Sequence, residues 1–195
     1  MIAQLRGTAV AVGATWVVVE VAGFGVKVLC PPATAAAQRV GAQSTLSTSL
    51  VVREDSLTLY GFASSDERDC FELVQTASGI GPKIALAVVA TLGADDLRAA
   101  VAGGNVAALT RVPGIGAKGA QRLILELKDK VGQLSLAGQA SGVPGGWREQ
   151  VKTGLEGLGW SSRDADAACD RVAALAETET SVAVLMRAAL RTLAK

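Results

Sequence analysis

The first 63 residues alternate between short apolar segments and turn-forming residues, a pattern that predicts β-structure. In the segment after Thr15, Val17, Val19 and Val21 share one face of a strand, and the polar Glu20 lies on the other. The expected strands are Ile2–Val12, Thr15–Val21, Gly25–Leu29, Thr45–Val52 and Leu57–Phe62. Five such strands suit a small closed barrel of the OB type, which leaves no exposed sheet edge; an SH3-like barrel is the alternative.

From Ser64 the spacing of apolar residues becomes helical. Ser64 followed by Glu67 is a capping box, which indicates the start of a helix, and Gly93 is placed to end a later helix. The expected helices after the first are Ile84–Leu92, Asp95–Ala102, Val106–Arg111 and Lys118–Val131. Together they form a central domain over residues 64–132.

The pattern changes twice after residue 132. Residues 133–146 are small, rich in glycine and without periodicity, which predicts a flexible linker. Residues 147–195 fit a UBA-like domain of three short helices, Trp147–Leu158, Ser162–Leu175 and Ser181–Leu193. The apolar stripe of the last helix is more typical of a core than of a partner surface. The predicted fold class is therefore α+β with several domains.

Within the central domain a Gly-Ile-Gly sequence occurs at Gly79–Gly81 and again 35 positions later at Gly114–Gly116. The following residues align as well, since Lys83 matches Lys118 and the apolar positions of the next helices coincide. A helix, a tight glycine turn and a second helix, repeated once, predict a tandem helix-hairpin-helix. Two ordinary turns between helices are the alternative, because one Gly-x-Gly is enough to turn a corner.

Each glycine turn has the features of a phosphate-binding site. Glycine permits a positive φ and lets a ligand approach the backbone, and the turn opens into a helix N-terminus whose free N–H groups attract an anion. Lys83 and Lys118 add positive charge, and Ile80 and Ile115 are expected to anchor the turns in the core. Such contacts recognise the shape of a nucleic acid rather than its sequence, and they are sensitive to salt.

Two motifs have competing interpretations. Gly114, Gly116 and Gly119 match a dinucleotide-binding fingerprint, but a helix is expected before them, and Glu126 follows too early for the ribose-binding acid. The segment Arg53–Ser56, between the last two strands, is either a solvated polar turn or a negatively charged tip that repels phosphates. Its adjacent carboxylates also suggest a metal nuclease, which would need further ligands.

Composition and charge narrow the possible functions. The chain has 195 residues, a formal net charge of +1 and no histidine, the commonest general base and metal ligand. It contains no P-loop, so work driven by ATP must come from a partner, and neither cofactor nor metal is expected. Leu97–Leu125 contains cations and no acid, whereas Asp66–Glu72 gathers acids. Neither a signal peptide nor a membrane span is expected, and Cys30, Cys70 and Cys169 are expected to be buried thiols in a reducing cytoplasm.

Along its whole length the chain resembles the RuvA family, the bacterial proteins that recognise Holliday junctions. The resemblance rests on both Gly-Ile-Gly turns and on four further segments, Met1–Gly7, Val51–Asp55, Leu59–Phe62 and Leu158–Trp160. Many repair proteins share a helix-hairpin-helix, but this order of parts is specific.

The resemblance implies a function and a set of partners. Members form a homotetramer, or an octamer of two tetramers, that holds a four-way DNA junction open and square-planar. They recruit the hexameric ATPase RuvB through the C-terminal domain, in a complex that also includes the resolvase RuvC. The chain would then be a non-catalytic, cytoplasmic subunit that acts in recombination and repair and is not bound to a membrane.

The resemblance also assigns roles to residues of this chain. It implies that Glu54 and Asp55 are an acidic pin at the crossover, in place of a plain polar turn. The implied DNA contacts are Gly79, Gly81, Lys83, Gly114, Gly116 and Lys118, with Arg53 and Arg122 as additional ones. The family often has two lysines and then a small hydroxyl residue where this chain has Ala117-Lys118-Gly119, so one phosphate contact per subunit is in doubt.

Two rival functions remain open from the residues alone. One is a structure-specific nuclease that uses Glu54 and Asp55 with metal ions. The other is a general single-strand binder built on the barrel, which would need stacking aromatic residues. The barrel has few of them: Trp16, Phe24, Tyr60 and Phe62.

Overall fold

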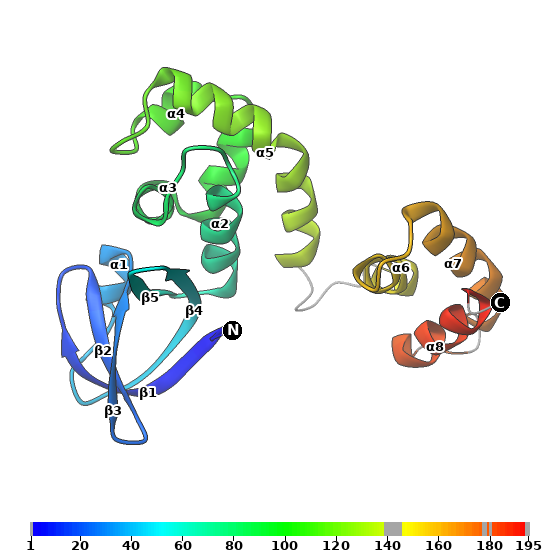
Figure 1. Ribbon diagram of the computed structural model, residues 1–195, viewed down its shortest axis with the longest axis horizontal. Coiled ribbons are helices and arrows are strands. Elements are labelled where there is room, and N and C mark those ends of the chain that lie inside the picture. The colour runs from blue at the N-terminus through cyan, green and yellow to red at the C-terminus, as the bar shows by residue number, and fades with distance from the viewer. Residues whose placement is uncertain (1, 139–145, 177–178, 180, 194–195) are drawn as a thin grey trace. The chain divides into compact units, whose positions relative to one another are not determined.

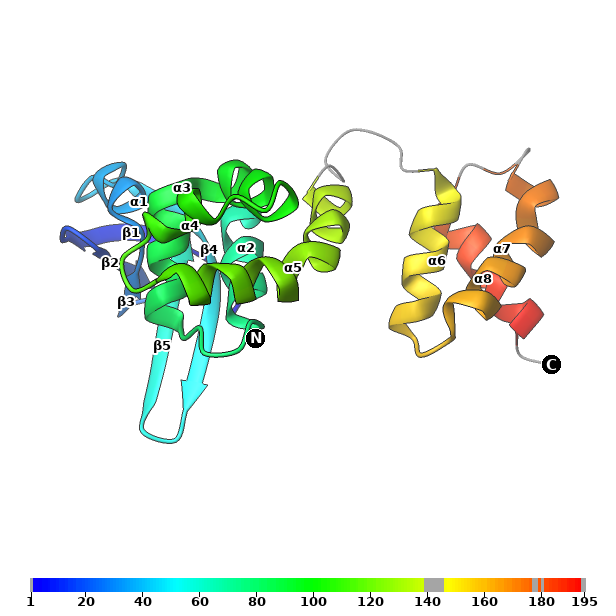
Figure 2. The same cartoon turned by 90° about the horizontal axis from the view of Figure 1, so that it is seen from above.

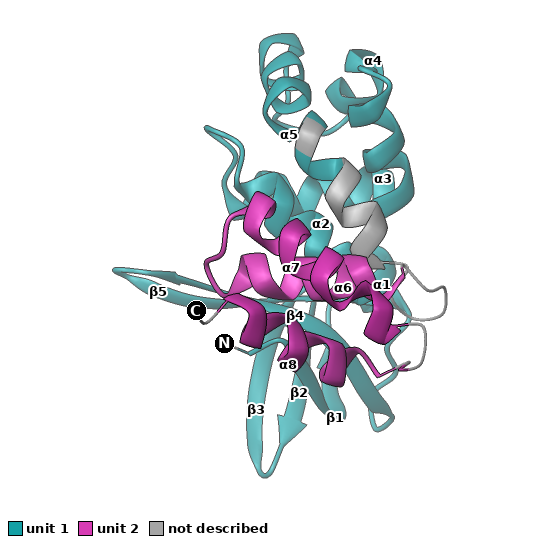
Figure 3. Ribbon diagram, turned by 90° about the vertical axis from the view of Figure 1, so that its right-hand side faces the viewer, with its two compact units in different colours: residues 1–138 teal, residues 139–195 magenta. Residues whose placement is uncertain are grey.

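The computed structural model describes residues 2–138, 146–176, 179 and 181–193. The chain divides into two compact units, Met1–Gly138 and Gln139–Lys195 (Figure 3), and each unit has a hydrophobic core of its own. Among the described residues, no helix is both long enough and apolar enough to cross a membrane.

The first unit begins with a closed barrel of five strands, as the alternation of apolar residues predicted (Figure 1). The strands follow the order β1-β2-β3-β5-β4, and only the β3–β5 pair is parallel. Closure leaves no unpaired edge. The strand bounds are β1 Gln4–Val12, β2 Trp16–Val21, β3 Phe24–Leu29, β4 Gln43–Arg53 and β5 Ser56–Phe62.

Apolar side chains from all five strands fill the barrel. Val17 and Val19, which were predicted to share one face of β2, are fully buried and pack with Val28 and Leu46. A close approach of two strands requires the glycine at Gly7, since a Cβ there would lie 2.0 Å from the carbonyl oxygen of Glu20. The short helix α1, Pro32–Ala36, was not predicted, because five residues are too few to show a helical period.

Four helices complete the first unit: α2 Ser65–Gln75, α3 Pro82–Ala102, α4 Val106–Thr110 and α5 Ala117–Gly138. Ser64 caps α2 as predicted, with its hydroxyl accepting a hydrogen bond from the Glu67 N–H at 3.2 Å. The Glu67 carboxylate in turn accepts from the Ala63 N–H. The helices expected at Ile84–Leu92 and Asp95–Ala102 are the two halves of α3, which is broken at Gly93 (φ 70°, ψ −178°).

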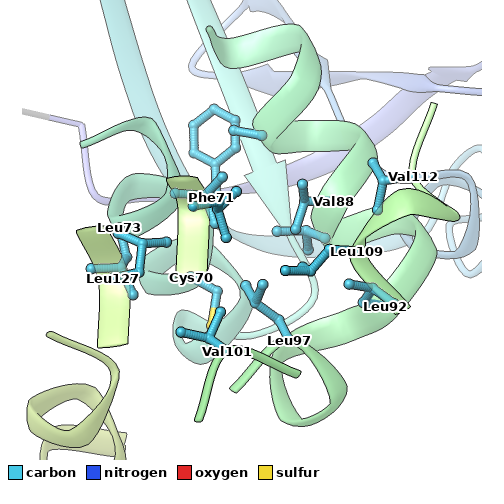
Figure 4. Close-up of a cluster of buried hydrophobic side chains, with 14 of the residues drawn as sticks. Cys70, Phe71, Leu73, Val88, Leu92, Leu97, Val101, Leu109, Val112 and Leu127 are labelled. Carbon is cyan, nitrogen blue, oxygen red and sulfur yellow. The ribbon is translucent and has the colours of Figure 1, made fainter. Parts of the chain in front are cut away.

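Aromatic packing joins the barrel to the helices. The Phe71 ring of α2 lies 4.9 Å from the ring centroids of both Tyr60 and Phe62 on β5. From there the core continues through Leu97, Leu109 and other side chains of α3, α4 and α5 (Figure 4). The barrel end and the helical part therefore share one core cluster.

Helix α5 is longer than predicted. We expected it to end at Val131 and a linker to cover residues 133–146, but the helix continues to Gly138. Residues 133–137 contain no proline, and their leucine, glutamine and alanine residues favour a helix. The rest of the expected linker, 139–145, lies outside the described residues.

The described residues of the second unit form three helices, as predicted: α6 Trp147–Gly157, α7 Ser162–Ala176 and α8 Val182–Leu193. Leu185 and Ala189 of the predicted apolar stripe are fully buried, with Val182, Met186, Leu190 and Leu193 packed against the same core. Gly159 (φ 99°) ends α6 in a Schellman motif, with the Trp160 N–H donating to the Leu155 carbonyl.

The three cysteines are free thiols with buried side chains. Burial raises the pKa of Cys30 and of Cys70 to about 11. Because the thiolate is the reactive form, these two residues are unreactive at neutral pH. They act as small hydrophobic core residues, in agreement with the sequence analysis.

A bidentate ion pair links α2 to α3. Arg98 donates to both carboxylate oxygens of Asp66, at 2.6 and 2.7 Å, and also to Asp95 at 2.6 Å. The hydrogen bond from Arg98 lowers the pKa of Asp66. The side chain of Arg98 is only 16% exposed and that of Asp66 only 32%. The pair therefore stabilises the contact between the two helices more than a fully solvated pair would.

We predict that Arg98→Met lowers the free energy of unfolding by about 1–3 kcal/mol at pH 7, because it leaves Asp66 without its charged donor. The pKa of Asp66 is lowered in the folded protein, so its contribution is present above the ordinary aspartate pKa of about 3.9 and is lost as the pH falls below it. Urea denaturation of both proteins from pH 7 to pH 3 measures this. The exposed Arg111→Met is the control, and an equal loss in that variant would contradict the prediction.

Candidate nucleic-acid interface

The two Gly-Ile-Gly turns adopt the same backbone structure. The first hairpin (Gly79–Gly81) joins α2 to α3, and the second hairpin (Gly114–Gly116) joins α4 to α5 (Figure 1). The first glycine of each has a positive φ, 80° at Gly79 and 89° at Gly114, a region that L side chains rarely adopt. The predicted pair of helix-hairpin-helix motifs is confirmed.

Hydrogen bonds repeat at the same offset. The Ile80 N–H donates to the Ala77 carbonyl at 3.2 Å, and the Ile115 N–H donates to the Val112 carbonyl at 3.1 Å. Likewise, the carbonyls of Gly81 and Gly116 accept the first bond of the helix that follows each hairpin. The remaining N–H groups of these helix starts are therefore available to an anion in a similar geometry.

The isoleucine of each hairpin packs against the core and the lysine that follows it is exposed, as the sequence indicated. Ile115 is buried and Ile80 is half-buried against the same core, so both hold their hairpins in place. Lys83 and Lys118 are exposed, one position inside the helix start. Their charges are thus free to reach a phosphate beside each hairpin.

Each hairpin is contacted by a helix of the other motif. Arg122 of α5 lies over the first hairpin, with its Nη2 atom 3.3 Å from the place that a Cβ on Gly79 would take. Ile84 of α3 lies against the second hairpin, 3.6 Å from the corresponding place on Gly114. These contacts fix the two hairpins relative to each other, and Arg122 gives the first hairpin a second cation besides Lys83.

Glu126 is a residue of the site that the sequence analysis missed. Its carboxylate accepts a hydrogen bond from the Ser78 N–H at 2.8 Å, directly before the first hairpin. This bond is the main reason that the pKa of Glu126 is lowered, and Arg122 and Lys130 lower it further. The spacing of four between Arg122 and Glu126, which places both on one side of a helix, was the available signal.

The two motifs differ at this position. Pro113 stands where the first motif has Ser78, and a proline has no N–H to satisfy. Conversely, Pro82 removes one N–H from the start of α3, whereas Ala117 keeps it at the start of α5. The second hairpin thus offers one more backbone N–H donor than the first. This is the motif in which Ala117 stands where the family often has a lysine.

Glu54 and Asp55 form the turn between β4 and β5, on a hairpin that projects from the barrel (Figure 2). Arg53 and Ser56 are the last pair of the ladder, and the Ser56 hydroxyl donates to the Asp55 carboxylate at 3.2 Å. Both acids are exposed. The hairpin therefore presents two negative charges at its tip.

Arg53 connects this tip to the first hairpin. Its Nη2 atom lies 3.8 Å from the place that a Cβ on Gly81 would take. The structure thus brings together Arg53, the first hairpin and Lys83 around an open groove. Within residues 2–138, 146–176, 179 and 181–193, no three Cys, Asp or Glu side chains gather as a group that could hold a metal ion.

Comparisons with known proteins cover nearly the whole chain. Residues 1–61 match the model of the RuvA N-terminal domain, residues 71–129 that of a SAM-like tandem helix-hairpin-helix, and residues 146–194 that of the RuvA C-terminal domain. The chain is 56% identical to a protein of Cutibacterium acnes and 56% identical to one of a Nocardioides species, each over the full length of both chains. A Thermobifida fusca protein is 53% identical over the same extent, and all three bear the name "Holliday junction branch migration complex subunit RuvA".

We predict that Glu126→Ala speeds hydrogen exchange at the Ser78 amide, because that N–H loses its acceptor. Glu126→Gln keeps an acceptor oxygen and should largely preserve the protection. In the wild-type chain, the lowered pKa of Glu126 means that the Ser78 amide signal shifts only below the ordinary glutamate pKa of about 4.3.

NMR exchange and pH titration test both statements. The Ile115 amide, which donates within the second hairpin, is the internal control and should keep its exchange rate in both variants. Equal exchange at Ser78 in the wild-type and Glu126→Ala proteins would contradict the role of Glu126.

Proposed function

The chain belongs to the RuvA family, and on that basis we propose that it binds four-way DNA junctions as a tetramer, holds them open and recruits the RuvB ATPase for branch migration. The observation that carries the proposal is the contact between Arg53 and Gly81. Arg53, the residue before the acidic tip, lies beside Gly81 of the first hairpin, which supports a negatively charged tip and a phosphate-binding hairpin acting together in one unit.

The hairpins account for attraction to the duplex arms. Backbone N–H groups at the starts of α3 and α5, together with Lys83 and Lys118, would hold phosphates without reading bases. Gly79, Gly81, Gly114 and Gly116 would let the DNA backbone approach, and Arg122 would add a cation at the first hairpin. Binding should therefore follow the shape of the DNA and weaken as salt rises.

The acidic pin, Glu54 and Asp55, accounts for selectivity. A continuous duplex laid across the binding face would bring phosphates close to these two charges, and that approach is repelled. An opened junction has a gap between its arms where the pin fits. The pin therefore lowers the affinity for plain duplex more than the affinity for a junction.

The remaining steps belong to partners. We propose that the chain has no catalytic centre of its own and that the second unit docks RuvB, which hydrolyses ATP. Leu158, at the end of α6, is 60% exposed, and such docking would cover it. Assembly as a tetramer, or as two tetramers, a shared complex with RuvC, and action in the cytoplasm complete the proposal.

We predict that Glu54→Gln with Asp55→Asn raises the affinity for linear duplex by roughly three- to tenfold, because two charges near phosphates are removed. The affinity for a four-way junction should change less, so the ratio of junction affinity to duplex affinity should fall. Binding of a four-way junction and of a duplex of equal length, across a salt series without divalent metal, measures both. The single variant Glu54→Gln is measured as well, and Glu20→Gln, the same substitution at an exposed position of β2, is its matched control.

The same assay separates the rivals. Equal wild-type affinity for junction and duplex would contradict the proposed function, and unchanged selectivity in the double variant would contradict the role of the pin. Cleavage of labelled junction with Mg²⁺ or Mn²⁺ would indicate a nuclease instead. Strong competition by single strands would indicate a general single-strand binder.

We predict that a chain ending before Trp147 still binds junctions, because the barrel and both hairpins lie in the first unit with its own core. ATP-driven branch migration with RuvB should be abolished. Strand-exchange assays on labelled junctions measure the migration, with junction binding by the same truncated protein as the control. Retained migration would refute docking by the second unit.

A further inference from the structure

An open groove with a volume of about 480 Å³ runs between the β4–β5 hairpin and the first hairpin. This volume lies within the range of about 300–1,000 Å³ that is typical of small-molecule sites. Arg53 stands on the strand side, one residue before the acidic pin, and Lys83 stands on the helix side. The groove therefore begins directly at the base of the pin.

The lining of the groove has two kinds of surface. Val51 and Ile84 provide carbon walls, whereas Ser56 and Thr58 provide hydroxyl groups that can donate and accept hydrogen bonds. The two cations, Arg53 and Lys83, are the charged members of the lining. A nucleotide has the matching surfaces: a flat base with apolar faces and polar edges, joined to a negatively charged phosphate.

From this lining we propose that the groove receives an unpaired nucleotide of the DNA strand that crosses over at the acidic pin. Its base would lie between Val51 and Ile84, and its phosphate would lie against Arg53 and Lys83. The inference rests on the proposed function, because it needs a junction opened at the pin.

Energetics favour such a receiving site. Taking a base out of its pair and stack costs free energy, and a pin that only repels phosphates returns none of it. A groove that buries the base and neutralises its phosphate offsets part of that cost. The acidic pin would then repel the paired form of the crossover strand, and the groove at the base of the pin would stabilise the unpaired form of the same strand.

The test uses the full chain and a four-way junction with 2-aminopurine, which is bright when unstacked, at one base of the crossover. The same probe at the middle of an arm is the reference. Binding of the wild-type chain should raise the crossover signal several-fold and leave the mid-arm signal unchanged. Thr58→Phe, which fills the groove, should reduce that rise by at least half while the chain still prefers junction to duplex.

Thr45→Phe is the matched control, since it is the same substitution at an exposed position elsewhere on the barrel, on β4. It should behave as the wild-type chain. Ser56→Phe, at the exposed rim of the groove, is a second blocking variant. It replaces Thr58→Phe in the test if thermal denaturation shows that Thr58→Phe does not fold.

The outcomes distinguish this inference from the proposed function. If the wild-type chain prefers junctions but the 2-aminopurine signal at the crossover does not rise, the nucleotide-binding role of the groove is wrong and the proposed function still holds. The same conclusion follows if the blocking variants show the full rise of that signal. A wild-type chain without any junction preference would overturn both.

Discussion

The packing of Phe71 between Tyr60 and Phe62 is the contact on which the arrangement of the first unit depends. All three side chains are at least 95% buried, and both ring separations are 4.9 Å. Tyr60 and Phe62 belong to β5, whose other end leads to Glu54 and Asp55. Phe71 belongs to α2, which leads to the first hairpin. This buried contact thus fixes the strand that carries the acidic turn relative to the helix that leads to the first hairpin.

The tandem motif combines a repeated backbone with side chains that differ. Ile80 and Ile115 make equivalent hydrogen bonds, so the two hairpins present their donors in the same way. The first hairpin, however, is supported from α5 by Arg122 and Glu126, whereas Pro113 removes the need for such support in the second. The two hairpins therefore belong to one body rather than to two independent motifs, because a helix from each copy lies against the hairpin of the other.

Much of this arrangement could be predicted from local sequence patterns. Alternating valines identified the barrel strands, Ser64 with Glu67 identified the start of α2, and the repeated glycines identified both hairpins, because each of these signals acts through neighbours in the chain. The parts that could not be predicted depend on contacts between distant residues. The bond from Ser78 to Glu126 spans 48 positions, and the groove forms only when Thr58 of β5 faces Lys83 of α3. The continuation of α5 to Gly138 was missed for another reason: small residues, glycines and a lack of periodicity were interpreted as a linker, although residues 133–137 contain neither glycine nor proline.

The continuity of β4 has a mechanical consequence. This strand runs without interruption from its ladder with β1, inside the barrel, to Arg53 at the base of the pin, and it pairs with β5 over seven residue pairs, Ser47 to Phe62 through Arg53 to Ser56. A sideways force on the pin bends β4 and β5 together, and all seven residue pairs resist it as one unit because the turn joins the two strands. The load passes directly into a barrel that has no free edge to peel. A two-residue tip can thus serve as a fixed wedge without a bulky support around it, because the stiffness comes from the ladder behind it.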